Sequence, residues 1–217
     1  MFIGHFGVAF AAKRAAPDVN LGVLFAAAQL IDLVWPLLLL AGVERVRIAP
    51  GDTAFTPLEF THYPYTHSLL TVALWAALAG GAYWLWRRRG RAAVVVALLV
   101  ASHWLLDWLT HRPDLPLYPG SDKVAGLGLW DSIVGSLAVE GAIFAAGLAL
   151  YLQVTAARSR VGVWAVWSLV VFLIVTYLGA AFGPPPPDVA ALAWSALLVW
   201  LFPLWGYWAE RHRSPRV

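Results

Sequence analysis

The chain contains no cysteine and few charged residues. The absence of cysteine excludes disulfide bonds, thiolate nucleophiles and cysteine-ligated metals. Only 12% of the 217 residues are charged, compared with roughly 25% in a soluble domain, and 61% are hydrophobic. A chain with so little polar surface cannot cover a globule in water. We therefore expect most of it to lie in lipid, with the bilayer as its main partner.

Six apolar runs are long enough to cross a bilayer, which takes about 20 residues. An arginine-rich segment at 87–91 and a run of prolines at 184–187 mark two of the turns between them. We predict an all-α polytopic membrane bundle of about six transmembrane helices in one integral membrane domain, residues 1–217. The predicted spans are 21–43, 66–86, 92–110, 129–154, 161–182 and 189–208.

The positions of Lys and Arg predict the orientation of these spans. Cytoplasmic loops of membrane proteins carry an excess of basic residues. If the loop with Lys13 and Arg14 is cytoplasmic, eleven of the fifteen basic residues fall on that side. The C-terminus is then also cytoplasmic. The net charge of +3 is attributed to basic residues that set the orientation of the spans in the membrane. No nucleic-acid partner is therefore expected.

Residues 1–12 are apolar but too short to span a bilayer. As a helix they would reach about 18 Å, roughly half of the membrane thickness. We predict a half-helix that begins near the middle of the membrane, ends at Lys13 and carries His5 into the interior.

Several ionisable side chains fall inside the predicted spans, where each costs roughly 2.5–3.5 kcal/mol or more. The predicted orientation places them at a similar depth, in the outer half of the membrane. His103, Asp107 and His111 are four residues apart, so they share one helix face. The buried group is His5, Asp32, His67, His103, Asp107 and Glu140, with His62 and His111 at the mouths of spans.

Imidazole and carboxylate groups are natural ligands of zinc and similar ions. A divalent cation would also neutralise two buried aspartates. We predict one shell of Asp32, His67, His103 and Asp107, with His5 joining it or beginning a second site. A single buried His or Asp more often bonds a neighbouring helix, which is the simpler reading of Glu140. Convergence of the whole group favours a metal site.

Two motifs carry a family resemblance. The segments 62–68 (HYPYTHS) and 103–107 (HWLLD) resemble those of the bacterial membrane-bound metal-dependent hydrolases, which include a LexA-regulated member. The match covers about residues 1–115, so 116–217 would be supporting helices. The resemblance implies a bacterial inner-membrane protein, with Thr66 and Ser68 of its His-x-x-x-Thr-His-Ser element as supporting residues beside the ligands.

The order of ligands is also distantly similar to that of zinc-dependent phospholipase C. This similarity implies that Asp32, His67, His103 and Asp107 share one zinc ion, and that Asp107 bridges to a second ion touched by His5. The sequence departs from the family pattern before Asp32, where Gln29, Leu30 and Ile31 stand in place of an extra acid.

The leading functional prediction is a membrane-embedded metal-dependent hydrolase acting on an ester or phosphoester of a lipid. His62 or His111, at the mouth, would move protons or contact substrate, and Glu140 is a possible supporting residue. Arg112 and Lys123 would attract an anionic headgroup or serve as ordinary loop charges. Glu44, Asp52 and Glu59 are interpreted as solvated loop charges.

Three other functions fit the same residues. An ion or proton transporter would also bury ionisable groups, but it needs a polar path to the cytoplasm. A bis-histidine haem protein would use His5, His67 or His103, yet haem does not account for the aspartates. A protein that only retains a metal is the third. Oligomeric state is not predicted.

Overall fold

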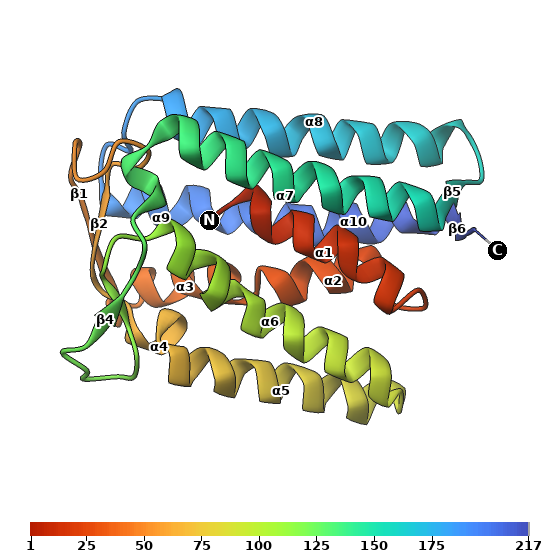
Figure 1. Cartoon of the computed structure of the whole chain (residues 1–217), viewed down its shortest axis with the longest axis horizontal. Coiled ribbons are helices and arrows are strands. Elements are labelled where there is room, and N and C mark those ends of the chain that lie inside the picture. Colours follow the sequence, from red (N-terminus) through yellow and green to blue (C-terminus); the bar gives the residue numbers. More distant parts are fainter. Residues whose placement is uncertain (217) are drawn as a thin grey trace.

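Long apolar helices make up most of the chain in the computed structural model, which describes residues 1–216 (Figure 1). Five helices in this part are long and apolar enough to cross a membrane, and there are six candidates if one bent pair of helices is counted as a single span. This confirms the prediction of an all-α bundle with about six spans. The five are α5 (Leu69–Arg87), α6 (Gly90–Thr110), α7 (Ile133–Val154), α8 (Arg160–Phe182) and the segment Val189–Arg211, which comprises α9 (Val189–Ala196), η2 (Leu197–Trp200) and α10 (Leu201–Arg211).

The first predicted span is a bent pair rather than one straight helix. Helix α2 (Leu21–Ala28) and helix α3 (Leu30–Leu40) meet at 55°. Gln29 joins them with φ −100° and ψ 6°. Pro36 lies inside α3 and has no N–H to donate to the carbonyl of Asp32, four residues earlier. The bend places Asp32 in the first turn of α3, beside the centre described below.

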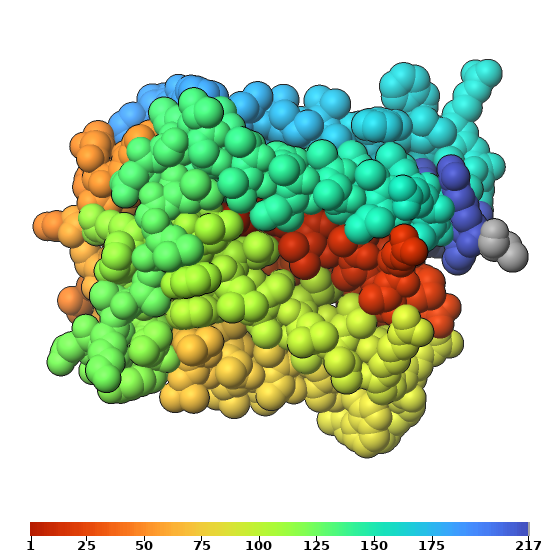
Figure 2. Space-filling model, in the orientation of Figure 1, coloured from red at the N-terminus to blue at the C-terminus, as the bar shows by residue number. Residues whose placement is uncertain are grey.

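The N-terminal helix α1 (Ile3–Ala15) begins inside the bundle, as predicted for a half-helix (Figure 1). It packs against α7, α2 and α6. Figure 2 shows that α1 lies between α7 and the α5–α6 hairpin. The contact with α7 is backbone to backbone, because a Cβ at Gly147 would lie 1.9 Å from the carbonyl oxygen of Gly7. Only glycine at these positions allows so close an approach.

Short strands, which the sequence did not predict, gather at both ends of the bundle (Figure 1). At one end, called here the strand end, β1 (Arg45–Ile48) pairs with β2 (Leu58–His62) and β3 (Leu115–Pro116) pairs with β4 (Val124–Ala125). At the opposite end, β5 (Thr155–Ala157) pairs with β6 (Arg213–Pro215). The strand end corresponds to the side that the basic residues predict to be outside.

Two short helices complete the strand end. Helix α4 (Pro64–His67) follows β2, and η1 (Leu129–Asp131) precedes α7. The predicted second span, 66–86, therefore begins later, at Leu69, because the backbone of Ser68 is extended and its side chain caps α5. His67 thus lies on α4 and not on the long helix.

Candidate metal centre

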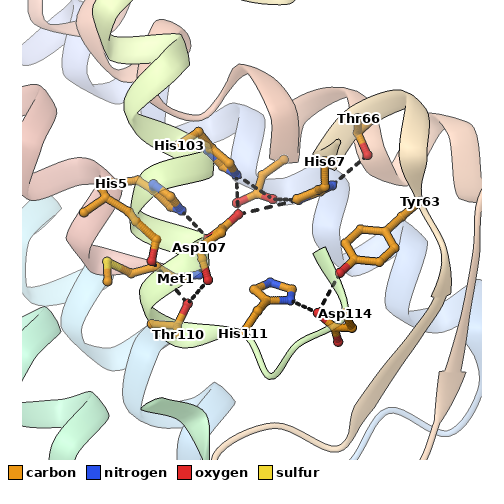
Figure 3. A network of polar contacts seen from close by, with 12 residues as sticks. Met1, His5, Tyr63, Thr66, His67, His103, Asp107, Thr110, His111 and Asp114 are labelled. Atoms are coloured by element: carbon orange, nitrogen blue, oxygen red, sulfur yellow. Dashed lines mark hydrogen bonds and ion pairs between the residues drawn. The ribbon is translucent and has the colours of Figure 1, made fainter. Parts of the chain in front are cut away.

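The five predicted metal ligands meet between α1, α3, α4 and α6. Figure 3 shows the three histidines turned toward the Asp107 side chain. His5 and His103 are fully buried, and Asp107 and His67 are nearly so. Asp32 differs, because 26% of its side chain is exposed. The centre is therefore covered on most sides and open beside Asp32.

Two imidazoles and two carboxylates alternate at the centre. His103 Nε2 lies 3.6 Å from Asp32 Oδ1 and 3.1 Å from Asp107 Oδ2. His67 Nε2 lies 3.5 Å and 3.8 Å from the same two oxygens. Ligand atoms bound to a tetrahedral zinc ion lie about 3.3 Å from one another. The four separations are close to this value, and donor atoms of Asp32, His67 and His103 all lie within 4.8 Å of one another.

His103 is held so that its Nε2 atom is free. Its Nδ1 atom donates a hydrogen bond to the backbone carbonyl of Ala28 at 2.8 Å. A carbonyl oxygen only accepts, so in the neutral ring Nδ1 carries the proton and Nε2 has a lone pair. Nε2 is buried and makes no hydrogen bond of normal geometry among residues 1–216, although Asp107 Oδ2 lies 3.1 Å away. Such an orphaned nitrogen fits a metal ligand.

His67 is oriented through Thr66 by a buried carboxylate. Its Nδ1 atom lies 2.7 Å from the Thr66 hydroxyl, which donates to Glu44 Oε2, also at 2.7 Å. The other oxygen of Glu44 accepts from the backbone N–H groups of Tyr65 and Thr66. Since the hydroxyl proton goes to Glu44, His67 Nδ1 must be the donor to Thr66, which leaves Nε2 free.

Glu44 is therefore not a solvated loop charge, and that interpretation was wrong. Its side chain is buried at the start of α4. The β1–β2 hairpin begins directly after Glu44 and returns the chain to α4. The sequence around Glu44 does not indicate that its side chain is buried while neighbouring side chains are exposed.

Asp107 presents its two oxygens to different partners. Oδ2 faces His103 and His67, whereas Oδ1 lies 3.1 Å from His5 Nε2 and 2.6 Å from the Met1 amino group. The His5 and His103 rings are stacked, with centroids 3.9 Å apart. A porphyrin does not fit between two rings in direct contact. His5, His103 and Asp107 form a second set of donor atoms within 4.8 Å of one another.

His111 lies beside the centre and is oriented by Asp114, a residue that the sequence reasoning missed. His111 Nδ1 is 3.0 Å from Asp114 Oδ1, to which the Tyr63 hydroxyl also donates at 2.7 Å. Figure 3 shows both contacts. The His111 and His67 ring centroids are 6.4 Å apart. The arrangement resembles the acid–histidine pair of a general base.

Asp114 itself lies in the loop after α6. Burial alone would raise its pKa, but hydrogen bonds from His111, Tyr63 and Arg112 hold the pKa of this carboxyl below its usual value. Arg112 also pairs with Asp52 and lies 3.9 Å from Glu59. Arg112 thus pairs with several carboxylates of the loops. This supports the interpretation that it is an ordinary loop charge rather than a residue that attracts an anionic headgroup.

Three other predicted site residues make contacts away from the ligands. His62 is exposed at the end of β2, with its ring against Tyr65. The Ser68 hydroxyl bonds Thr71 and caps α5. Glu140 accepts from the backbone N–H groups of Phe2 and Gly4, so it stabilises the start of α1. Of the predicted supporting residues, Thr66 alone bonds a candidate ligand within residues 1–216.

Comparison with known proteins identifies the family. A family model described as YdjM inner membrane protein matches residues 1–182, a range that includes every candidate ligand. Comparisons with curated proteins and with solved structures gave no match. Together with the apolar helices, the family match shows an integral inner-membrane protein. The chain belongs to the YdjM inner membrane protein family.

Proposed function

We propose that the protein is a membrane-embedded, metal-dependent hydrolase that cleaves an ester or phosphoester of a membrane lipid. The observation that carries the proposal is the alternation of two imidazoles and two carboxylates within 3.1–3.8 Å, with both Nδ1 atoms already bonded elsewhere. His111 stands beside this group with its own carboxylate partner.

A cation explains this cluster better than hydrogen bonding within it. Carboxylate oxygens and unprotonated imidazole nitrogens are all acceptors. Four acceptors facing one another in a buried space require a cation or shared protons between them. The Met1 amino group balances charge on Asp107 Oδ1, but its hydrogen bond is on the side away from His67 and His103. A zinc ion would satisfy all four donors at once.

A second ion would be held by His5 and Asp107 Oδ1, because the free nitrogen of His103 already serves the first ion. Because Asp107 turns one oxygen to each set of partners, it is the residue suited to bridge two ions. The proposed cofactor is therefore one or two zinc ions.

When bound, zinc supplies a nucleophilic water near neutral pH and polarises the scissile group. His111, held by ionised Asp114, accepts a proton from the attacking water and returns it to the departing alkoxide. The hydroxyl of water joins the acyl or phosphoryl group as the C–O or P–O bond breaks. The predicted orientation places this chemistry in the outer half of the membrane, with the C-terminus in the cytoplasm.

The proposal is tested with purified protein in liposomes of phosphatidylethanolamine and phosphatidylglycerol. We expect zinc-dependent lipid cleavage, detected by mass spectrometry of the products. His111→Ala is expected to keep its metal and lose at least tenfold in rate. Metal-loaded protein that cleaves none of these lipids and instead carries zinc into the vesicles would overturn the hydrolase in favour of transport.

A further inference from the structure

The turn between α5 and α6 is strongly basic. Arg87, Arg88, Arg89 and Arg91 are all exposed, and Arg88 and Arg89 alone separate the two helices. Because both helices are membrane-crossing candidates, so short a turn lies at the bilayer surface, where lipid phosphates also lie. The turn is at the end of the bundle opposite the strand end (Figure 1).

Most of this positive charge has no partner of opposite sign in the part of the chain that the structure describes. Asp18 is the one carboxylate there that pairs with the turn, and it pairs with Arg89 at 2.6 Å. The other three arginines form no ion pair with residues 1–216. Since a guanidinium keeps its charge at any ordinary pH, the turn presents a cationic surface to the headgroups.

Two of the guanidinium groups are positioned by tryptophan rings. The Cζ atom of Arg88 lies 4.7 Å from the ring centroid of Trp84, and that of Arg87 lies 5.0 Å from the ring centroid of Trp86. An indole face attracts a guanidinium and limits its movement. Stacking uses the flat face of the group and leaves N–H donors at its edge, in a fork that matches phosphate oxygens. The two groups are therefore oriented before an anion binds.

An apolar groove between α5 and α6 ends at the same turn. Its volume is about 360 Å³. The lining residues occupy positions i, i+3, i+4 and i+7 of each helix, so each set lies on one helix face. They are Ala77, Gly80, Gly81 and Trp84 of α5 and Gly90, Ala93, Val94 and Ala97 of α6.

The glycines of the groove show its depth. A Cβ at Gly80 would lie 2.8 Å from the Cβ of Ala97, so the two helices are in close contact at the floor. A Cβ at Gly81 or Gly90 would meet no atom within 4 Å, so the groove is open at these positions. Because α5 and α6 cross the membrane, the open side faces lipid.

Trp84 connects the groove to the basic turn. It lines the groove, and the Arg88 guanidinium stacks on its ring. At the start of α6, Gly90 lines the groove and Arg91 follows it directly. The site is thus apolar along the helices and positively charged at the bilayer surface. A phospholipid with a net negative charge has the complementary arrangement, an apolar chain that ends in an anionic headgroup.

We propose that the α5–α6 groove and its basic turn bind one anionic phospholipid, with the phosphate at Arg88 and Arg91 and an acyl chain between the helices. Charge complementarity favours this occupant over a zwitterionic lipid. It also disfavours a second copy of the chain, which would bring a second set of arginines to the same place. The inference does not depend on the metal centre, whose residues His103 and Asp107 lie toward the other end of α6.

The test counts lipids bound to the delipidated full chain by native mass spectrometry. The probes are phosphatidylglycerol and phosphatidylethanolamine with identical acyl chains. Two arginines at a membrane surface favour an anionic lipid by about tenfold or more, so we expect the first phosphatidylglycerol to bind about tenfold more tightly. Raising the ionic strength should reduce this preference, because salt screens exposed charges. Equal affinity for the two lipids would overturn the proposal.

A matched pair of charge variants locates the site. One variant combines Arg88→Gln with Arg91→Gln. Its control combines Arg158→Gln with Arg160→Gln, which removes the same charge from exposed positions in the α7–α8 turn at the same end of the bundle (Figure 1). We expect the first variant to lose the preference for phosphatidylglycerol and the control to keep it. Equal loss in both would mean that net charge, and not this site, attracts the lipid.

Filling the groove tests the position of the acyl chain. Gly81→Leu places a side chain in the groove, and Gly141→Leu is the control, since neither glycine has an atom within 4 Å of an added Cβ. The probe is phosphatidylglycerol with a diazirine in one acyl chain, cross-linked by light in nanodiscs. We expect Gly81→Leu to lower the labelling of 77–97 by about fivefold or more and Gly141→Leu to leave it unchanged.

Two results of the filling experiment would contradict the proposal. Labelling of 77–97 that is equal in Gly81→Leu and Gly141→Leu would show that no acyl chain lies in the groove. A dimer in the wild type that dissociates only in Gly81→Leu would show that a second copy of the chain occupies it.

Discussion

The Nδ1 atom of His103 lies 2.8 Å from the carbonyl oxygen of Ala28, the last residue of α2. The bend after Ala28 and the orientation of this imidazole are thus parts of one arrangement. Helix α2 fixes the His103 ring, and α3, beginning after the bend, brings Asp32 to within 3.6 Å of His103 Nε2. The broken span therefore contributes one candidate ligand and positions another.

The Thr66 hydroxyl connects His67 to Glu44, so its removal should weaken metal binding without removing a ligand. We expect Thr66→Val to lower zinc affinity by about 10–100-fold, the usual effect of losing a hydrogen bond that supports a ligand. Thr66→Ser keeps the hydroxyl and should bind as the wild type does. Competition with a chromogenic chelator measures both. Equal affinity of the Val and Ser variants would show that the relay does not orient His67.

Asp114 is expected to act through His111 rather than on the metal. Asp114→Asn preserves shape but no longer favours the tautomer with a proton on His111 Nδ1. We expect hydrolysis to fall by about 100-fold or more while zinc content is unchanged. Loss of zinc in this variant would indicate that Asp114 supports the fold of the centre instead.

The close approach of Gly7 and Gly147 should be needed to hold α1 in place. A Cβ at Gly147 would meet backbone atoms of Gly7, so we expect Gly147→Ala to destabilise the protein by about 1–3 kcal/mol, typical of overpacking. Gly141 lies on the same helix with no atom within 4 Å of an added Cβ. Gly141→Ala should be neutral or slightly stabilising.

Thermal unfolding in detergent compares these two glycine variants directly. Because α1 carries His5, Gly147→Ala should also lower zinc content. An unfolding temperature equal to that of Gly141→Ala would contradict the packing described for α1 and α7.

The spans and the convergence of the main candidate ligands could be predicted because both depend on local pattern. Apolar runs of sufficient length specify membrane helices, and His103 and Asp107 share a face because they are four residues apart. The depth of Asp32 and His67 followed from the orientation predicted by Lys and Arg.

Residues outside the long helices could not be placed in this way. Glu44 and Asp114 lie in loops, and a loop carboxylate has the same local sequence whether it is solvated or buried. Their positions depend on the β1–β2 hairpin and on the turn after α6, which are tertiary features. The partners of Glu140 could not be predicted either, because they are backbone N–H groups at the start of a helix inside the bundle.

The central claim is that a metal ion is bound by Asp107 and its histidine partners. The most direct measurement is the zinc content of the purified wild type, Asp107→Ala and Asp107→Asn by elemental mass spectrometry. His212→Ala is the control, since His212 follows α10 at the opposite end of the bundle. We predict one or two zinc ions per chain in the wild type and the control, and less than a tenth of that in both Asp107 variants. Equal zinc in all four proteins, or none in the wild type, would contradict the account.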